Sequence, residues 1–234
     1  MKVCCIGDIH GTDKFLTCYN DILKNDNDCE KIIVFGDHFD PYQYFSLEEM
    51  IEKYNKFSEI LKEDSRIVSL LGNHDLSYYI ISNDLTNRTH KWRGASKITD
   101  CIVSNLDKSY LCYRINDYLF SHAGVSKYWI DEIKQYVSNP NYVDRILNNY
   151  QGWTEEEMFI TSFYPFDESH YGDDVHQGCT WIRPTSLITC ALDDYNQVVA
   201  HTRVKEISKV QMDNGKDLWM IDTCGKPDYL TLNI

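Results

Sequence analysis

Residues 2–11 read KVCCIGDIHG, a short apolar run followed at once by Gly-Asp, and this pattern decides the fold because it occurs three times. It returns as KIIVFGDHFD at residues 31–40 and as RIVSLLGNHD at residues 66–75. Short apolar runs rich in β-branched residues are typical of strands that are buried on both faces. The sequence therefore predicts three buried strands, each of which ends where a Gly-Asp or Gly-Asn pair begins.

The segments between these runs have the periodicity of amphipathic helices. Apolar residues recur every three or four positions in residues 12–24 and again in residues 46–62. Ser46 and Glu49 stand at the spacing of a capping box at the start of the second segment. The alternation β-α-β-α-β predicts a parallel sheet. Because ligands of open α/β sheets collect at the carboxyl ends of the strands, the polar residues after the three runs should meet at one edge.

The second half of the chain has the pattern of antiparallel strands. Residues 110–115 and 118–121 flank Asn116-Asp117, which predicts a tight hairpin. Residues 204–210 and 218–222 are strand-like runs on either side of the turn signal Asn214-Gly215. We therefore expect an α/β sandwich with mixed sheets and helices on the outside.

Composition bounds the class of protein. A chain of 234 residues with 43% apolar content can close one core, so we expect a single domain over residues 1–234. The net charge of −13 argues against generic binding to nucleic acids or anionic membranes, which depends on a surplus of Lys and Arg. No apolar run reaches the roughly 20 residues that span a bilayer. The nine cysteines are odd in number and partly lie within apolar runs, which predicts reduced thiols and a cytoplasmic location.

Six side chains next to strand-like runs are candidate metal ligands. They are Asp8, His10, Asp37, Asn73, His122 and His201. Imidazole and carboxylate together suit Mn, Fe, Zn or Co better than Mg or Ca. Six ligands exceed the roughly three protein groups that one catalytic ion usually takes. We therefore expect two divalent ions at the carboxyl edge of the strands, with a carboxylate between them.

The order of these motifs carries a specific resemblance. Gly-Asp-x-His-Gly, Gly-Asp-x-x-Asp and Gly-Asn-His-Asp are followed by His122-Ala123-Gly124 and then by Ala200-His201-Thr202. This five-block pattern resembles that of the calcineurin-like metallophosphoesterases. The segment from Ile221 to Gly225 is similar to the final strand of their Ser/Thr-phosphatase-like branch, of bacterial and phage type. The blocks run from residue 7 to about residue 225, so the resemblance covers nearly the whole chain.

The resemblance implies a role for each matching residue. Asp8 and His10 would hold the first metal and Asp37 would bridge the two. The second metal would be held by Asn73, His122 and His201. The implied cofactors are two divalent ions, Mn first, with Fe, Zn, Co or Ni as alternatives. A hydroxide bridging two such cations is a nucleophile at neutral pH.

The resemblance also implies the proton donor of the reaction. His74 would be the general acid that protonates the leaving oxygen, and Asp40 would orient its ring and raise its pKa. An imidazole held by a carboxylate is well placed to give a proton to a departing alkoxide.

The chain departs from the family at the position that grips phosphate. Pro41 stands where the Ser/Thr-phosphatase pattern has an arginine after its second aspartate. Arg183, in Trp181-Ile182-Arg183, and Arg203 are the candidate replacements. Arg203 also stands two residues after His201, where the nuclease-like branch usually has a second histidine.

The implied activity is hydrolysis of phosphomonoesters, with a Ser/Thr phosphoprotein as the leading substrate. The alternative is hydrolysis of a dinucleoside polyphosphate or another nucleotide, including phosphodiester cleavage, which the Trp-x-Arg segment and the missing arginine favour. A non-catalytic scaffold is a distant third reading, because every ligand and the acid histidine are present. Substrate contacts are expected from residues 83–109 and 161–186, which are rich in His, Asp, Arg and aromatic residues.

Overall fold

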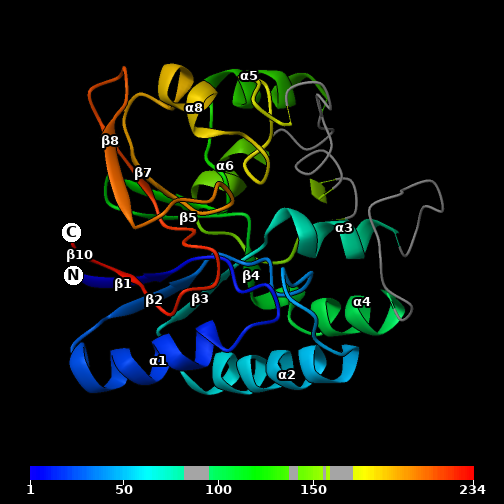
Figure 1. Ribbon diagram of the computed structural model, residues 1–234. Coiled ribbons are helices and arrows are strands. Elements are labelled where there is room, and N and C mark those ends of the chain that lie inside the picture. The colour runs from blue at the N-terminus through cyan, green and yellow to red at the C-terminus, as the bar shows by residue number, and fades with distance from the viewer. Residues whose placement is uncertain (82–94, 137–141, 155–156, 159–170) are drawn as a thin grey trace.

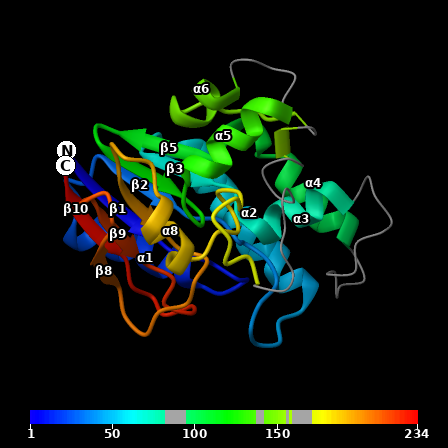
Figure 2. The ribbon, with the colours of Figure 1, turned by 90° about the horizontal axis from the view of Figure 1, so that it is seen from above.

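The computed structural model describes residues 1–81, 95–136, 142–154, 157–158 and 171–234. Two five-stranded sheets pack face to face, and helices cover the outer face of each (Figure 1). Seen from above, the strands of both sheets overlap on the side of the two termini, and most of the labelled helices lie toward the opposite side (Figure 2). The expected α/β sandwich with mixed sheets is confirmed.

The first sheet is parallel except at one edge. Its order is β10-β1-β2-β3-β4, and β10 alone runs antiparallel to its neighbour. The three predicted strands are therefore adjacent and parallel, as the β-α-β-α-β pattern required. Its strands are β1 (Lys2–Ile6), β2 (Lys31–Val34), β3 (Ile67–Leu70), β4 (Ser109–Tyr110) and β10 (Leu230–Asn233).

The second sheet has a parallel centre and an antiparallel hairpin at each edge. Its order is β5-β6-β7-β9-β8, with β6, β7 and β9 parallel to one another. Both predicted hairpins form, although the run predicted as one strand over residues 110–115 is divided: residue 110 pairs in the first sheet and residues 112–115 pair in the second. The last one pairs residues 208–211 with residues 217–220 and is therefore shorter than expected, although the Val204 N–H still donates to the Asp222 carbonyl beyond the paired residues. The strands are β5 (Cys112–Ile115), β6 (Tyr118–Ser121), β7 (Asn196–Val199), β8 (Ser208–Gln211) and β9 (Asp217–Met220).

Alternate residues of each central strand face different cores. Val3 and Cys5 of β1 point between the sheets and pack in one cluster with Phe120 of β6. Cys4 and Ile6 of the same strand point outward to the helices. Both faces of β1 are thus covered by apolar side chains, which explains why the run is apolar throughout and does not alternate.

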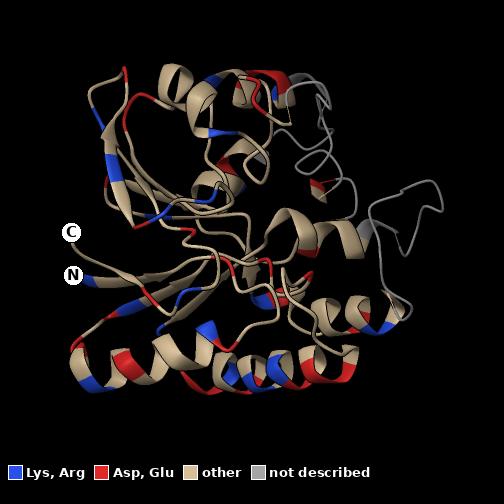
Figure 3. Cartoon of the chain, viewed as in Figure 1, with Lys and Arg blue, Asp and Glu red and all other residues tan. Residues whose placement is uncertain are grey.

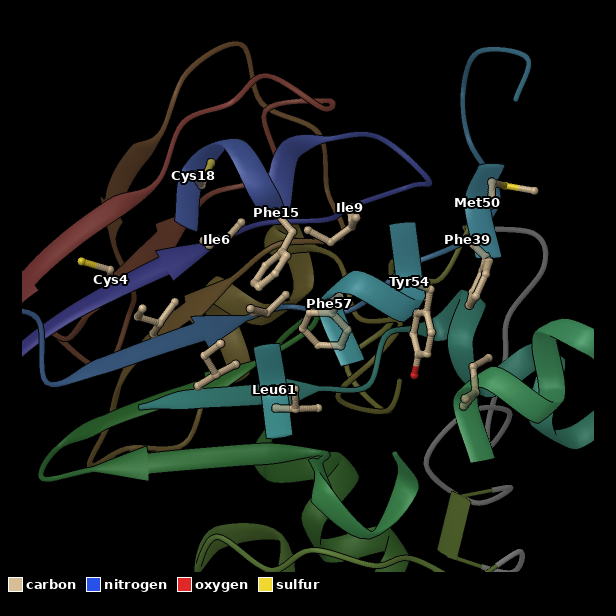
Figure 4. Packing of buried hydrophobic residues seen from close by; sticks show 14 of the residues in the cluster. Cys4, Ile6, Ile9, Phe15, Cys18, Phe39, Met50, Tyr54, Phe57 and Leu61 are labelled. Atoms are coloured by element: carbon tan, nitrogen blue, oxygen red, sulfur yellow. The ribbon is translucent and has the colours of Figure 1, made fainter. Parts of the chain in front are cut away.

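Two long helices cover the outer face of the first sheet. These are α1 (Lys14–Asn25) and α2 (Leu47–Glu63), and Phe15 and Phe57 from them meet edge to face at 4.9 Å between ring centroids (Figure 4). The capping box predicted at the start of α2 is present. Acidic and basic residues are interspersed along both helices (Figure 3), as on an ordinary solvated surface.

The remaining helices belong to two groups. Near the strand ends of the first sheet lie α3 (Asn73–Ile81), α4 (Ala95–Val103) and the short η1 (Leu106–Lys108). Over the second sheet lie α5 (Lys127–Tyr136), α6 (Tyr142–Leu147) and α8 (Pro184–Cys190) (Figure 1). Within the described ranges, no helix has the length and apolar character that crossing a membrane requires. All nine cysteines are free, and seven of them are buried.

Candidate metal centre

The carboxyl ends of strands from both sheets meet at one place. In the first sheet, Asp8 and Asp37 lie just beyond the ends of β1 and β2, and Asn73 begins α3 after β3. In the second sheet, His122 directly follows β6 and His201 lies two residues after β7. The two sheets face each other, so residues that are far apart in the chain are brought to the same edge.

Asp8, Asp37 and His122 form the centre of this cluster. Each offers one ligand atom, and these atoms all lie within 4.8 Å of one another. Asp37 Oδ2 lies 3.4 Å from His122 Nε2 and 3.7 Å from His10 Nε2. His122 Nε2 is also 3.0 Å from Asn73 Oδ1. The six predicted ligands therefore share one neighbourhood, which His201 joins through its backbone N–H, 3.3 Å from Asp8 Oδ1.

Each histidine of the cluster has one ring nitrogen beside a backbone carbonyl. His122 Nδ1 lies 2.7 Å from the Phe35 carbonyl oxygen, and His10 Nδ1 lies 2.9 Å from that of Asp40. His201 Nε2 lies 3.2 Å from the Trp181 carbonyl oxygen. Because a carbonyl only accepts, these nitrogens carry a proton, and the other nitrogen of each ring is the one that can bind a metal. Metal-binding histidines are held in this way, so the residues present fit a divalent cation.

The carboxylates of the cluster shift the pKa values of the histidines beside them. Burial lowers the pKa of His10, but the Asp8 and Asp37 carboxylates outweigh it and raise that pKa to about 9. Burial is likewise outweighed at His122, where Asp37 and Asp8 raise the pKa to about 10. Without a cation the carboxylates thus draw protons onto the His10 and His122 rings, whereas burial and the neighbouring His122 lower the pKa of His201. A bound divalent cation would take the place of those protons.

The backbone around the cluster is held in an unusual conformation. His10, Asp37, Asp40 and His201 have φ angles of 45°, 50°, 59° and 57°, in the left-handed region that non-glycine residues rarely adopt. Each such residue costs about 1–3 kcal/mol and persists only where the surrounding structure enforces it. At Gly72 a Cβ atom would collide with the Asp37 carboxylate, so the close approach of two strand ends requires glycine there.

Asp75 ties the loops after β2 and β3 together. Its Oδ2 accepts from the Asp37 N–H at 2.7 Å and from the Gly72 N–H at 3.1 Å. Its Oδ1 accepts from the His38 N–H at 2.9 Å. One fully buried carboxylate thus holds the turn that presents Asp37 and caps the start of α3. Its place in the Gly-Asn-His-Asp motif was the only sequence signal for this role.

His74 and Asp40 form a pair beside the cluster. His74 Nδ1 lies 2.7 Å from Asp40 Oδ2, and the His74 backbone N–H donates to Asp37 Oδ1 at 2.9 Å. Burial lowers the pKa of His74, but the carboxylates of Asp37 and Asp40 outweigh it and raise that pKa. The side chain is 39% exposed, so it reaches the surface of the cleft described next.

A cleft of about 830 Å³ opens over the cluster, and both predicted arginines line it. Arg183 donates from Nη1 to Thr202 Oγ1 at 3.1 Å and to the His201 carbonyl at 3.3 Å. The Arg203 guanidinium carbon lies 3.7 Å from the centroid of the Tyr42 ring. Sequence reasoning missed Tyr42, although it follows Asp40-Pro41, where the family arginine is absent.

The predicted substrate segments are only partly described. Residues 83–94 and 161–170 lie outside the described residues. The described residues from 95 to 109 belong mostly to α4, η1 and β4, and none of them lines the cleft. The later segment does contribute, through Trp181 and Arg183.

Comparison with known proteins places the chain in a family. The family model for calcineurin-like phosphoesterases matches residues 1–202. The structure of a cold-active protein-tyrosine phosphatase from a psychrophilic Shewanella is similar, with a TM-score of 0.58 and 20% identity over 99% of this chain and 75% of that one. A Ser/Thr phosphatase from Saccharomyces cerevisiae matches with a TM-score of 0.47 and 14% identity over 95% of this chain and 67% of that one. No curated protein matches. The likeness to the Shewanella structure is one of fold.

Proposed function

Because the chain belongs to the calcineurin-like phosphoesterase family, we propose that it hydrolyses phosphomonoesters at a site for two divalent cations. The family makes it a metal-dependent phosphoester hydrolase. The class of ester, the number of ions and the residue roles are the proposal. The observation that carries it is the meeting of two carboxylates, one amide and three imidazoles from both sheets beneath one cleft. Each of those imidazoles has one ring nitrogen beside a backbone carbonyl.

The proposed ligands fall into two sets that share one carboxylate. Asp8 and His10 would hold one ion, and Asn73, His122 and His201 would hold the other. Asp37 would bridge them, which its Oδ2 supports by lying near both the His10 and the His122 ring. Mn is the first candidate, with Fe, Zn, Co or Ni as alternatives. When bound, such ions stabilise developing negative charge on a phosphoryl oxygen and activate water.

His74 is proposed to protonate the leaving oxygen. Its Nδ1 faces Asp40, which leaves Nε2 for the substrate. The Asp40 carboxylate fixes the orientation of the ring and favours its charged form. The imidazolium can then give the Nε2 proton to the alkoxide as the P–O bond breaks, and the neutral ring recovers a proton from water.

The substrate proposed first is a phosphorylated serine or threonine of a protein. Arg183 and Arg203 supply positive charge at the cleft and would grip the phosphate in place of the arginine that Pro41 replaces. A nucleotide is the second candidate, because Tyr42 and Trp181 also line the cleft and can stack on a base.

Metal dependence tests the proposed chemistry directly. Protein stripped of metal is expected to be inactive on p-nitrophenyl phosphate, and Mn or Co is expected to restore turnover. The bis-ester should be a much poorer substrate, because its phosphate has one negative charge fewer and one unesterified oxygen fewer than the monoester, and so binds the cations and arginines less strongly. Activity restricted to the bis-ester would replace the monoesterase proposal with a phosphodiesterase. No turnover with Mn, Co, Zn, Ni or Mg would refute the proposed hydrolysis.

The same loaded protein distinguishes the substrates. Phosphate release is measured from peptides carrying phosphoserine, phosphothreonine or phosphotyrosine and from a dinucleoside tetraphosphate. Faster release from the phosphoserine and phosphothreonine peptides supports the first candidate. Preferential cleavage of the dinucleotide supports the second, and a preference for phosphotyrosine would contradict both.

Removal of an arginine should weaken substrate binding. Arg203→Ala and Arg183→Ala are each expected to raise KM for p-nitrophenyl phosphate about tenfold, the effect of losing a hydrogen bond to a charged group. Steady-state kinetics at constant metal content provide the measurement. Arg114→Ala is the matched control, because that arginine bonds Tyr195 and Asn148 away from the cleft. An unchanged KM in both variants would remove the arginines from the proposed site.

A further inference from the structure

Helix α3 directs two polar side chains at one carboxylate. His74 and Tyr78 are four residues apart, so they lie on the same face of the helix. Asp40, in the loop after β2, lies between them. Its Oδ2 is 2.7 Å from His74 Nδ1, and its Oδ1 accepts the Tyr78 hydroxyl proton at 2.5 Å. The three groups thus form a continuous chain from the core to the cleft.

Tyr78 is the rigid end of this chain. The residue is 1% exposed and its ring packs edge to face on Phe39. Thr99 of α4 donates from Oγ1 to the Tyr78 carbonyl at 2.9 Å and holds this turn of α3 from outside. Contacts with the core therefore determine where the hydroxyl points.

Asp40, in contrast, lies outside any strand or helix, and its φ of 59° places it in the left-handed region. Its backbone carbonyl oxygen lies 2.9 Å from His10 Nδ1. A short hydrogen bond from a hydroxyl to a carboxylate is among the strong ones in proteins. Burial and the Asp40 carboxylate raise the pKa of Tyr78, so the phenol stays protonated and donates. Its bond to Oδ1 leaves Oδ2 facing His74.

We propose that Tyr78 is a positioning residue for hydrolysis: it fixes the Asp40 carboxylate, which in turn orients His74 toward the leaving oxygen. This inference rests on the proposed role of His74 as the general acid. A plainer reading is that a buried tyrosine merely takes the nearest acceptor. The two readings predict different effects of removing the hydroxyl on the hydrolysis rates of esters whose leaving groups differ in basicity.

Tyr78→Phe on the metal-loaded enzyme tests the proposal. Phenyl phosphate, whose leaving group needs a proton, is expected to lose roughly tenfold in kcat, the size expected for one hydrogen bond to a charged group. 2,4-Dinitrophenyl phosphate, whose leaving group departs unaided, should change less than about twofold. KM and metal content should stay constant. An equal loss on both esters would overturn the proposal.

Tyr54→Phe is the matched control. Tyr54 is also a buried tyrosine that packs on Phe39 (Figure 4), but its hydroxyl accepts from Asn105 Nδ2 at 3.1 Å. It is expected to leave the ratio of the two esters unchanged. If Tyr54→Phe moved that ratio as much as Tyr78→Phe does, the effect would come from the core and the proposal would fail.

A double variant tests the role of Tyr78 separately from the proposed role of His74 as the general acid. In a His74→Asn background, Tyr78→Phe should have no further effect on phenyl phosphate, because the group that it positions is gone. An undiminished second loss would show that Tyr78 acts elsewhere. If His74→Asn alone showed no dependence on the leaving group, the proposed general acid and the inference would both fail. If the loss in His74→Asn depended on the leaving group but the loss in Tyr78→Phe did not, only the inference about Tyr78 would fail.

Discussion

Asp37→Asn is expected to release both cations and to abolish turnover. The substitution keeps the size of the side chain and an oxygen for the His74 backbone N–H, but it removes the charge that Asp37 places between the His10 and His122 rings. A neutral amide is a poor bridge between two cations. If the ions supply several kcal/mol of transition-state stabilisation, turnover should fall by at least about 10³-fold.

The metal content of the purified variant, measured by elemental analysis, is the decisive quantity. Asp131→Asn is the control, because Asp131 lies on the exposed side of α5 and pairs only with the surface residue Lys134 among the contacts described. The control should keep its metals and its activity. Two tightly bound ions in Asp37→Asn would contradict the bridging role, and loss of one ion would assign Asp37 to a single metal.

His74→Asn is expected to separate catalysis from metal binding. The variant should keep both ions, because His74 Nδ1 faces Asp40 and the ring meets a predicted ligand only by packing edge to face on His10, at 5.3 Å between centroids. Loss of a general acid typically costs 10²–10⁴-fold, so kcat on phenyl phosphate should fall by roughly that factor. The loss should be least on 2,4-dinitrophenyl phosphate, whose leaving group needs no proton. Steady-state kinetics and elemental analysis on the same preparation test both parts.

His176→Asn is the matched control for His74. His176 Nδ1 also pairs with an aspartate, Asp174 Oδ1 at 3.1 Å, but neither residue lines the cleft. This variant should retain full activity on both esters. A metal-free His74→Asn protein would make His74 a ligand and refute its role as the acid. A uniform loss on both esters would assign it to binding.

Much of the fold and the neighbourhood of the site could be predicted from local sequence. The apolar runs before Gly7, Gly36 and Gly72 are buried strands, and the order of elements determined that these strands are parallel neighbours. Parallel neighbours bring their carboxyl ends to one edge whatever else the chain does. The meeting of Asp8, Asp37 and Asn73 therefore followed from topology alone.

His122 and His201 were predicted as ligands from their places after strand-like runs and from the resemblance to a family, but their contacts depend on tertiary structure. Both follow strands of the second sheet, and they reach the cluster only because that sheet packs over the first. The periodicity of a sequence predicts strands and helices, but it does not predict how two sheets pack on each other. Substrate contacts were predicted from residues 83–109; of these, residues 95–109 do not line the cleft, and the sequence did not show on which side of it α4 packs.

The sequence by itself determined which chemical groups stand at the ends of which strands. Only the tertiary structure decided how those groups are held: the Asp75 carboxylate across two loops, the carbonyls beside three histidines, and the Tyr78 hydroxyl on Asp40. The physical reason is the distance along the chain over which each kind of interaction acts. Strand formation and strand order depend on neighbours in sequence and on connection rules. Hydrogen bonds between residues 30 or more positions apart depend on positions of about an ångström that arise only when both sheets and their helices pack together.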